Sequence, residues 1–139
     1  MSEGSVIIGI GVDLVEHLRM AELIARRPRA LERMFTPAEL EYADRFKGEG
    51  RVARLAARFA AKEAVSKALG INLFSVALRE ISVVPSSGGA PVVLLQGRCR
   101  ELARLKGVEH VSLSISHERS NSIAFAVAFG HHGGERPAY

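Results

Sequence analysis

The sequence predicts an α+β fold, a single domain of mostly antiparallel strands packed with helices. A long Ala-rich segment without proline is typical of a helix, and short runs of Val, Ile and Leu between turn residues are typical of strands. The 139 residues are 47% hydrophobic and 24% charged, which suits one globular domain with a real core. Since no repeat or linker divides the chain, we expect the domain to cover residues 1–130 and residues 131–139 to form a loose C-terminal tail.

The first half of the chain is predicted to hold one buried strand and three helices. A run of Val and Ile predicts the strand, and helical spacing of apolar residues before Pro28 predicts the first helix. Thr36 and Glu39 form a capping box with Pro37 at the first helical position, and Gly70 suits the left-handed cap that closes a helix. The expected bounds are Val6–Asp13 for the strand, Leu14 to about Arg26 for the first helix, a second helix from Thr36, and Arg51–Leu69 for the long helix.

The second half is predicted to hold a hairpin, a short helix and two further strands. Residues 85–90 are rich in Ser and Gly and predict the hairpin turn, while Gly107 ends the short helix. Residues 111–117 alternate apolar side chains with Ser, so this strand is expected to be half-buried. The expected bounds are Glu80–Val84, Pro91–Leu95, Val111–His117 and Ser122–Phe129 for the strands and Arg98–Lys106 for the helix.

The charge balance favours an anionic partner. Lys and Arg number 19 against 15 Asp and Glu, for a net charge of +4 and an isoelectric point of about 9.7. A nucleic acid, an acidic protein and a phosphorylated small molecule all fit this charge. One candidate function is therefore a basic nucleic-acid-binding module without catalytic activity. The absence of Trp, with the few aromatic residues placed in apolar runs, argues against the stacking platforms that single-stranded nucleic acids use, so no nucleic-acid partner is expected.

The single cysteine, Cys99, excludes a disulfide framework or a Cys-based zinc site within one chain. The apolar run of residues 6–12 is too short to span a membrane and has no basic segment before it. We therefore expect a cytoplasmic protein that does not enter a membrane.

The long helix carries charged residues where an apolar face is expected. Leu55, Phe59, Ser66 and Leu69 fall within one narrow arc, Lys62 falls inside it, and Glu63 sits at its edge beside Lys67. Burying an unpaired charge costs several kcal/mol, so a charged group is expected to meet this face. A metal ion with phosphate groups would suit a carboxylate surrounded by cations. The alternative is a solvated pair of Glu63 and Lys67, which contributes about 0.2–0.5 kcal/mol.

Two shorter patterns add candidate site residues. Gly9 and Gly11 share a strand face with Asp13, which leaves room for a ligand or another backbone beside the carboxylate; Asp13 capping a helix is the alternative. Leu14 stands where a dinucleotide-binding loop would need a third glycine, so that interpretation is rejected. His117 ends an apolar row and is either a site residue or a hydrogen-bonded core histidine.

These patterns occur together in an order that resembles a known family. The chain is similar to the small trimeric branch of the 4′-phosphopantetheinyl transferases, the holo-[acyl-carrier-protein] synthases. The resemblance runs from about Val6 to Phe129 and leaves out the tail. Its motifs are Gly9–Asp13 followed by Arg19, Phe59–Ala68, Ser114–His117, Thr36–Leu40, and Gly89–Pro91 in the hairpin.

The resemblance implies a reaction and a set of site residues. Enzymes of this family move 4′-phosphopantetheine from coenzyme A to a serine of apo acyl carrier protein and release 3′,5′-ADP. By position, Asp13 and Glu63 match the ligands of Mg²⁺, and Lys67 matches a lysine near the coenzyme A pyrophosphate. Arg58 and His117 match residues that bind the nucleotide end of coenzyme A. Asp13, Glu63 and Lys67 are thus the expected catalytic residues, with Glu63 as a candidate base.

The resemblance also implies two protein contacts. Acyl carrier proteins of this kind are acidic, so the basic first helix with Arg19, Arg26 and Arg27 is the expected docking face, although interleaved acidic residues also fit a solvated surface. The family is usually a homotrimer with active sites at subunit interfaces, and the apolar rows of Val111–His117 and Ser122–Phe129 are candidates for that interface. Fatty-acid and polyketide carriers, and Mg²⁺ and Mn²⁺, all remain candidates.

Overall fold

The structure, a computed structural model, describes residues 4–72 and 76–131, which form five strands and five helices. The tail expected over residues 131–139 lies outside this range except for its first residue. The elements in chain order are β1 (Val6–Glu16), α1 (His17–Arg26), α2 (Ala30–Met34), α3 (Pro37–Ala43), α4 (Glu49–Leu69), the 3₁₀ turn η1 (Leu78–Glu80), β2 (Ile81–Pro85), β3 (Pro91–Leu95), α5 (Gly97–Leu105), β4 (Val108–His117) and β5 (Asn121–Gly130).

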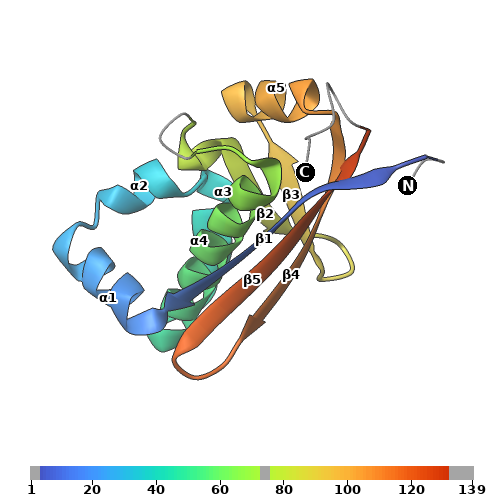
Figure 1. Cartoon of the computed structure of the whole chain (residues 1–139). Coiled ribbons are helices and arrows are strands. Elements are labelled where there is room, and N and C mark those ends of the chain that lie inside the picture. The colour runs from blue at the N-terminus through green and yellow to red at the C-terminus, as the bar shows by residue number, and fades with distance from the viewer. Residues whose placement is uncertain (1–3, 73–75, 132–139) are drawn as a thin grey trace.

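The predicted fold class is confirmed. Strands β1, β5 and β4 form an antiparallel sheet in that order, and β2 and β3 form a separate hairpin. Helix α4 lies along one face of the three-stranded sheet, and α5 and the hairpin lie near one end of it (Figure 1). Helices α1 to α3 pack around α4 beside the sheet rather than over it (Figure 1). Within the described ranges, no helix has both the length and the apolar character needed to cross a bilayer.

Two glycines bring β1 directly onto the backbone of α4. A Cβ atom added to Gly9 would overlap the carbonyl oxygen of Ala68, and one added to Gly11 would overlap that of Ala64. The same Cβ on Gly11 would lie only 2.8 Å from the amide nitrogen of Ala68. The space left by the missing side chains is therefore filled by another backbone, one of the two outcomes that the sequence allows.

Two apolar clusters stabilise this arrangement. The larger cluster lies between α4, the inner face of the sheet, β2 and α5, and includes Val65, Leu69, Ile81 and Cys99. The smaller cluster joins α1, α2 and α3 to the first half of α4 around Phe35. Because α4 contributes to both, it is the element that fixes the position of α1 and α2 relative to the sheet.

Several predicted bounds were wrong. Strand β1 continues past Asp13 to Glu16, because β5 pairs with it along the whole length, so α1 begins at His17 rather than at Leu14. Helix α4 begins at Glu49, after Gly48 with φ of 54°, and not at Arg51. Helix α2 was not predicted. The capping box at Thr36 and the left-handed Gly70 that closes α4 are confirmed.

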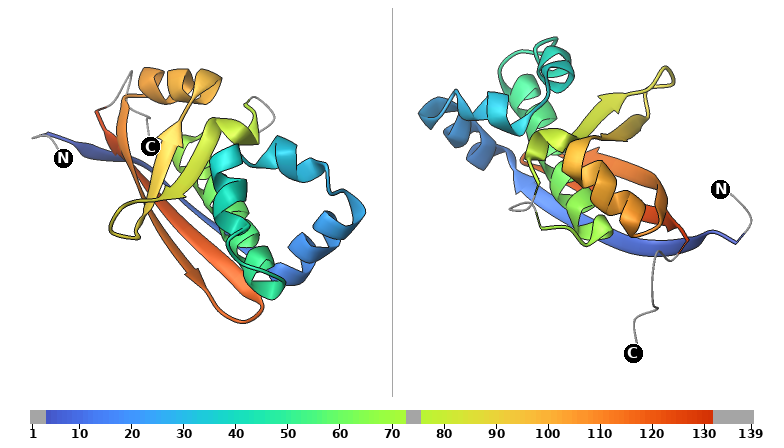
Figure 2. Two further views of the ribbon diagram at one scale, coloured as in Figure 1. Left: turned by 180° about the vertical axis from the view of Figure 1, so that it is seen from behind. Right: turned by 90° about the horizontal axis from the view of Figure 1, so that it is seen from above.

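The outer face of the three-stranded sheet bears no helix in the described part of the chain (Figure 2). Several of its large apolar side chains are between 41% and 61% exposed. They are Ile10, Val12 and Leu14 of β1 and Ile123 and Phe125 of β5. The apolar row predicted on β4 is not part of this surface, because Val111, Leu113 and Ile115 pack against the core and the intervening serines point outward.

The charged face predicted on α4 is in fact two faces. Lys62 is fully buried, and its ammonium lies 2.7 Å from Oε1 of Glu39 and donates to the carbonyl oxygens of Leu78 and Ile81. Burial lowers the pKa of Lys62, and the Glu39 carboxylate offsets part of that effect. The expected charged partner thus exists, but for Lys62 it is a carboxylate of α3 and not a metal ion with phosphate. Glu63 points about 100° away around the helix and belongs to the site described next.

Candidate active site at the junction of β1, α1 and α4

The close approach of β1 to α4 brings together Asp13, Glu63 and Lys67. Asp13 lies within β1, opposite Ala124 of β5, so it does not cap a helix as the alternative interpretation proposed. The Lys67 ammonium lies 3.3 Å from Oδ1 of Asp13 and donates to the carbonyl of Val12 at 2.9 Å. Lys67 therefore pairs with Asp13 and Val12 of β1, whereas the alternative interpretation of the sequence paired it with Glu63.

Glu63 is held in a partly desolvated and negative environment. Burial raises its pKa, the neighbouring Asp13 carboxylate raises it further, and Lys67 offsets part of this effect. Carboxylates with a perturbed pKa are frequent at functional sites, because catalytic and binding groups need a pKa matched to their task. Lys67 forms its ion pair with Asp13, and the second carboxylate beside it, Glu63, suits a further positive charge.

A pocket of about 360 Å³ opens between these residues and α1. Asp13 and Glu63 lie at one side of it, and Arg19 of α1 lines it with them. Its remaining walls are apolar and come from four elements: Leu14 and Val15 of β1, Met20 and Leu23 of α1, Met34 of α2 and Phe59 of α4. The pocket thus combines carboxylates, a guanidinium and an apolar wall, an arrangement that suits a ligand with charged and apolar parts.

The donor set fits Mg²⁺. Two carboxylates supply hard oxygen ligands, which Mg²⁺ prefers. In residues 4–72 and 76–131 no group of three or more His, Cys, Asp and Glu side chains could hold a metal ion. The protein alone would therefore supply two ligands, and substrate oxygens or waters would supply the rest, which is how Mg²⁺ is commonly bound.

Arg58 does not lie with the carboxylates. It is five residues before Glu63 on α4, which places it about 140° away around the helix. Its guanidinium is buried and lies 4.3 Å from the centre of the Tyr42 ring, and burial lowers its pKa. Among the residues that the structure describes, its buried Nε has no hydrogen-bond partner, which is unusual for a buried donor.

His117 is also separate from the carboxylates within one chain. It is exposed at the end of β4, so it is not the hydrogen-bonded core histidine that was the alternative. It lines a broad groove of about 1160 Å³ between α1, the start of α4 and the β4–β5 turn. Leu14 borders both this groove and the pocket of Asp13 and Glu63.

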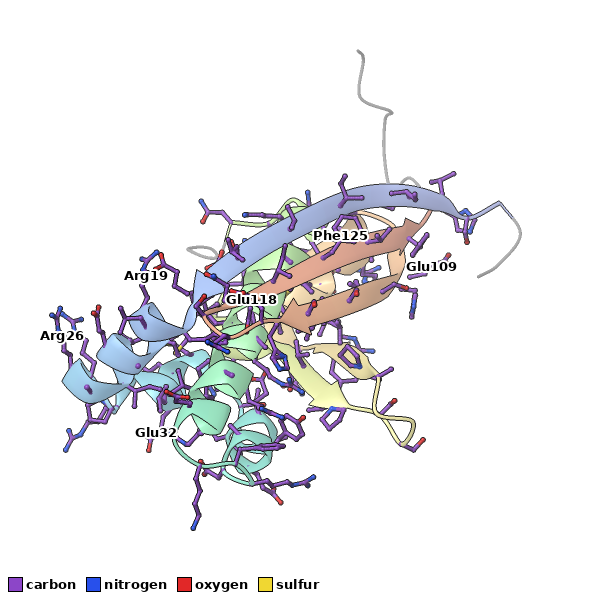
Figure 3. The ribbon with its side chains drawn as sticks, turned by 90° about the horizontal axis from the view of Figure 1, so that it is seen from below. Arg19, Arg26, Glu32, Glu109, Glu118 and Phe125 are labelled. Atoms are coloured by element: carbon purple, nitrogen blue, oxygen red, sulfur yellow. The ribbon has the colours of Figure 1, made fainter. Side chains whose placement is uncertain are left out.

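The three predicted docking arginines lie along α1 and its end. Arg19 is in the first turn and lines the carboxylate pocket, while Arg26 is in the last turn and Arg27 caps the helix. All three are exposed. Figure 3 shows Arg19 and Arg26 on the same helix, with Arg19 nearer the sheet. Only Arg19 of the three is therefore placed to contact a group that reaches Asp13.

The sequence did not predict the apolar wall of the pocket. Met20, Leu23, Met34 and Phe59 have the spacing of ordinary core residues, and Met34 belongs to a helix that was not predicted. The capping box identified Glu39 as the residue that caps α3, but nothing in its spacing indicated that the same carboxylate also accepts from the amide of Val83 and pairs with Lys62.

Comparison with known proteins gives consistent matches over nearly the whole chain. A sequence profile of the 4′-phosphopantetheinyl transferase superfamily matches residues 9–128. A holo-[acyl-carrier-protein] synthase of Moorella thermoacetica is 45% identical over 117 residues, which are 84% of this chain and 90% of that protein. The crystal structure of such a synthase from Neisseria meningitidis superposes with a TM-score of 0.80 at 34% identity, covering 88% of this chain and 98% of that one. One from Bacillus anthracis, in complex with CoA (3′,5′-ADP), gives 0.74 at 31% identity, covering 90% and 98%.

Proposed function

Since the chain belongs to the 4′-phosphopantetheinyl transferase superfamily, as an enzyme of the holo-[acyl-carrier-protein] synthase family, we propose that its reaction takes place at the pocket of Asp13, Glu63 and Lys67. The reaction transfers 4′-phosphopantetheine from coenzyme A to a serine hydroxyl of apo acyl carrier protein, with Mg²⁺, and releases 3′,5′-ADP. The observation that carries the assignment is the junction itself: two carboxylates and an ammonium, from segments 50 residues apart, meet beside an apolar pocket.

Asp13 and Glu63 are proposed to hold Mg²⁺. When bound, the ion would supply Lewis-acid stabilisation of the charge on the coenzyme A phosphates. Burial raises the pKa of Glu63 and the Asp13 carboxylate raises it further, and a cation between the two carboxylates would relieve this repulsion. Lys67 has a side chain 54% exposed, so its ammonium can turn toward a phosphate without leaving a buried position.

The attacking hydroxyl belongs to the carrier protein, so this chain needs a proton acceptor and no nucleophile of its own. Glu63 is proposed as that acceptor, directly or through a water. Its raised pKa brings a carboxylate closer to the range in which a base works at neutral pH. Arg58, with its unpartnered Nε, and His117 are proposed to bind the nucleotide end of coenzyme A.

Helix α1 is proposed as the docking element for the carrier protein. Arg19 combines an exposed positive charge with a place in the wall of the carboxylate pocket, so an acidic partner that contacts it is brought to the reacting groups. Arg26 and Arg27 extend the positive charge to the far end of the helix.

A homotrimer with active sites between subunits is proposed on two observations. The outer sheet face exposes large apolar side chains on β1 and β5, a contiguous arrangement that soluble proteins usually cover. Within one chain, Arg58 and His117 lie away from the carboxylates, which is the arrangement expected when a coenzyme A site is completed by residues of a second subunit. Light scattering of the purified protein measures the assembly directly, and a monomer at micromolar concentration would contradict it.

The function is tested by incubating the protein with coenzyme A, Mg²⁺ and apo acyl carrier protein and measuring the carrier mass. A gain of one phosphopantetheine is expected, and it should vanish in EDTA and return with added Mg²⁺. Activity retained in EDTA would contradict the metal assignment alone. No mass gain, together with salt-sensitive binding of an oligonucleotide, would favour a nucleic-acid-binding module instead.

A further inference from the structure

The first residue of α1 connects this helix to the opposite end of the chain. The amide of His17 donates to the carbonyl of Ser120 at 2.9 Å, and its ring Nδ1 lies 3.2 Å from the carbonyl oxygen of Arg119. Ring Nε2 lies 2.8 Å from Oγ of Ser122, a fully buried hydroxyl on β5. These contacts join residues more than 100 positions apart. They lie at the β4–β5 turn, which Figure 3 marks with the label of Glu118 beside the start of α1.

The chemistry of the partners defines the tautomer of His17. A carbonyl oxygen can only accept, so Nδ1 carries the hydrogen and donates to Arg119. In the neutral ring Nε2 is then an acceptor, and the Ser122 hydroxyl donates to it. The other acceptor near this hydroxyl, the carbonyl of Ala53 on α4, is farther away at 3.4 Å. One imidazole thus links α1 to both the turn and β5.

The backbone at the start of helix α1 is held, because Glu16 pairs with Asn121 and the amide of His17 donates to Ser120, but few side chains of this helix are anchored. Its N-cap residue, Glu16, makes no side-chain capping bond, and of its ten residues, all within the described range, Met20 is the one that is buried. Yet Arg19 and Met20, two and three residues after His17, form part of the carboxylate pocket wall. The position of that wall therefore depends on how firmly the first turn is held.

We propose that His17 is a positioning residue for carrier-protein docking. Its imidazole holds the first turn of α1 against Ser122 and the carbonyl of Arg119, and so keeps Arg19 at the mouth of the Asp13 pocket. The inference rests on the proposed function, since it assigns the docking contact to Arg19. It concerns the binding of the carrier protein and not that of coenzyme A. His17 lies outside the carboxylate pocket, and although it lines the groove that holds His117, both of its ring nitrogens are occupied by Arg119 and Ser122.

The test compares His17→Ala, Ser122→Ala and His17→Asn, with His110→Ala as the control at a histidine of β4 remote from α1. Losing both side-chain hydrogen bonds in His17→Ala should raise the KM for the carrier protein by roughly three- to ten-fold, with kcat and the KM for coenzyme A changed less than two-fold. Ser122→Ala should give a smaller rise, because the bond to Arg119 remains. His17→Asn keeps a donor near the Nδ1 position and should recover part of the loss.

Hydrogen exchange of residues 17–26 gives a readout that does not depend on transfer. His17→Ala should speed exchange in α1 relative to α4, while His110→Ala should not. If wild-type protein shows no transfer, the proposed function fails, while the exchange data still decide whether His17 anchors α1. Unchanged exchange and an unchanged carrier KM would overturn the inference. So would an equal loss in both KM values and kcat with a lowered melting temperature, which indicates a general structural role. If His17→Ala does not fold, the same measurements on Ser122→Ala decide the question: a raised carrier KM with faster exchange in α1 supports the inference, and unchanged values overturn it.

Discussion

Replacing Gly11 by Ala tests the claim that backbone contact between β1 and α4 sets the site geometry. The added Cβ would lie 2.8 Å from both the amide nitrogen of Ala68 and Cβ of Lys67, and would overlap the carbonyl oxygen of Ala64. Ordinary contact begins at about 3.4 Å, so strand and helix must separate by at least about 0.6 Å to relieve the first two contacts alone. Because the overlapping atoms are backbone, no side-chain rotation can relieve the overlap with Ala64.

We expect Gly11→Ala to lower the free energy of unfolding by about 3 kcal/mol, the upper end of the usual cost of overpacking. With an m-value of about 2 kcal/mol/M, the urea midpoint measured by circular dichroism falls by roughly 1.5 M. The same displacement moves Asp13 relative to Glu63 and Lys67, and an error near 1 Å costs about 100-fold in rate, so transfer by the folded variant should fall by at least about ten-fold.

Gly50→Ala is the matched control for this substitution. Gly50 lies in the first turn of α4, and a Cβ there would meet its nearest atom, Cβ of Phe46, at 3.6 Å. The control should keep full activity and gain about 0.5–1 kcal/mol in helix stability. A Gly11→Ala protein with the unfolding midpoint and turnover of wild type would refute the reasoning, because the close backbone approach would then carry no energetic weight.

Three further substitutions test the site. Glu63→Gln should abolish transfer yet raise the melting temperature at pH 7. Because the pKa of Glu63 is raised in the folded state, the contribution of this carboxyl group to stability is present below about pH 4.5 and is lost as pH rises through the folded-state pKa. The difference in melting temperature between the variant and wild type should therefore shrink toward pH 4. A lower melting temperature at pH 7 would contradict this. Arg19→Glu should raise the KM for carrier protein much more than that for coenzyme A, and added salt should mimic it; equal shifts would remove α1 from docking. Lys67→Ala should lower kcat by roughly 100-fold with little change in melting temperature, since an exposed ion pair contributes at most about 1 kcal/mol; near-normal turnover would exclude Lys67 from the reaction.

Local patterns in the sequence were sufficient for most of the fold. Alternation, capping residues and turn glycines act between near neighbours, so the hairpin, α3, α5 and the end of α4 were predicted within a few residues. Strand β1 was predicted too short, because its last residues are held by pairing with β5, more than 100 residues away. Helix α2, with five residues, is too short for a periodic signal.

The site was predicted in residue identity better than in contacts. Asp13 and Glu63 were named, and the structure brings them together. The alternative pairing of Lys67 with Glu63 did not anticipate its contact with Asp13, and Lys62 was placed on the same face as Glu63. Helical spacing gives the angle between side chains around the helix, but it does not reveal which other segment packs against each side. Glu39, the partner of Lys62, lies on a different helix, and only the tertiary structure joins them.

The buried pair of Lys62 and Glu39 also bears on which changes in chain length this enzyme can tolerate. Lys62 and Glu63 are adjacent, and one is committed to a buried carboxylate while the other is committed to the pocket. Each residue turns the helix by about 100°, so inserting one residue before Lys62 would place its ammonium at the position that faces the pocket, and deleting one would place the Glu63 carboxylate at the buried position beside Glu39. Helix α4 therefore has a single acceptable rotational register, and the loop that ends at Gly48, outside the helix, is where the chain can gain or lose residues without exchanging the two.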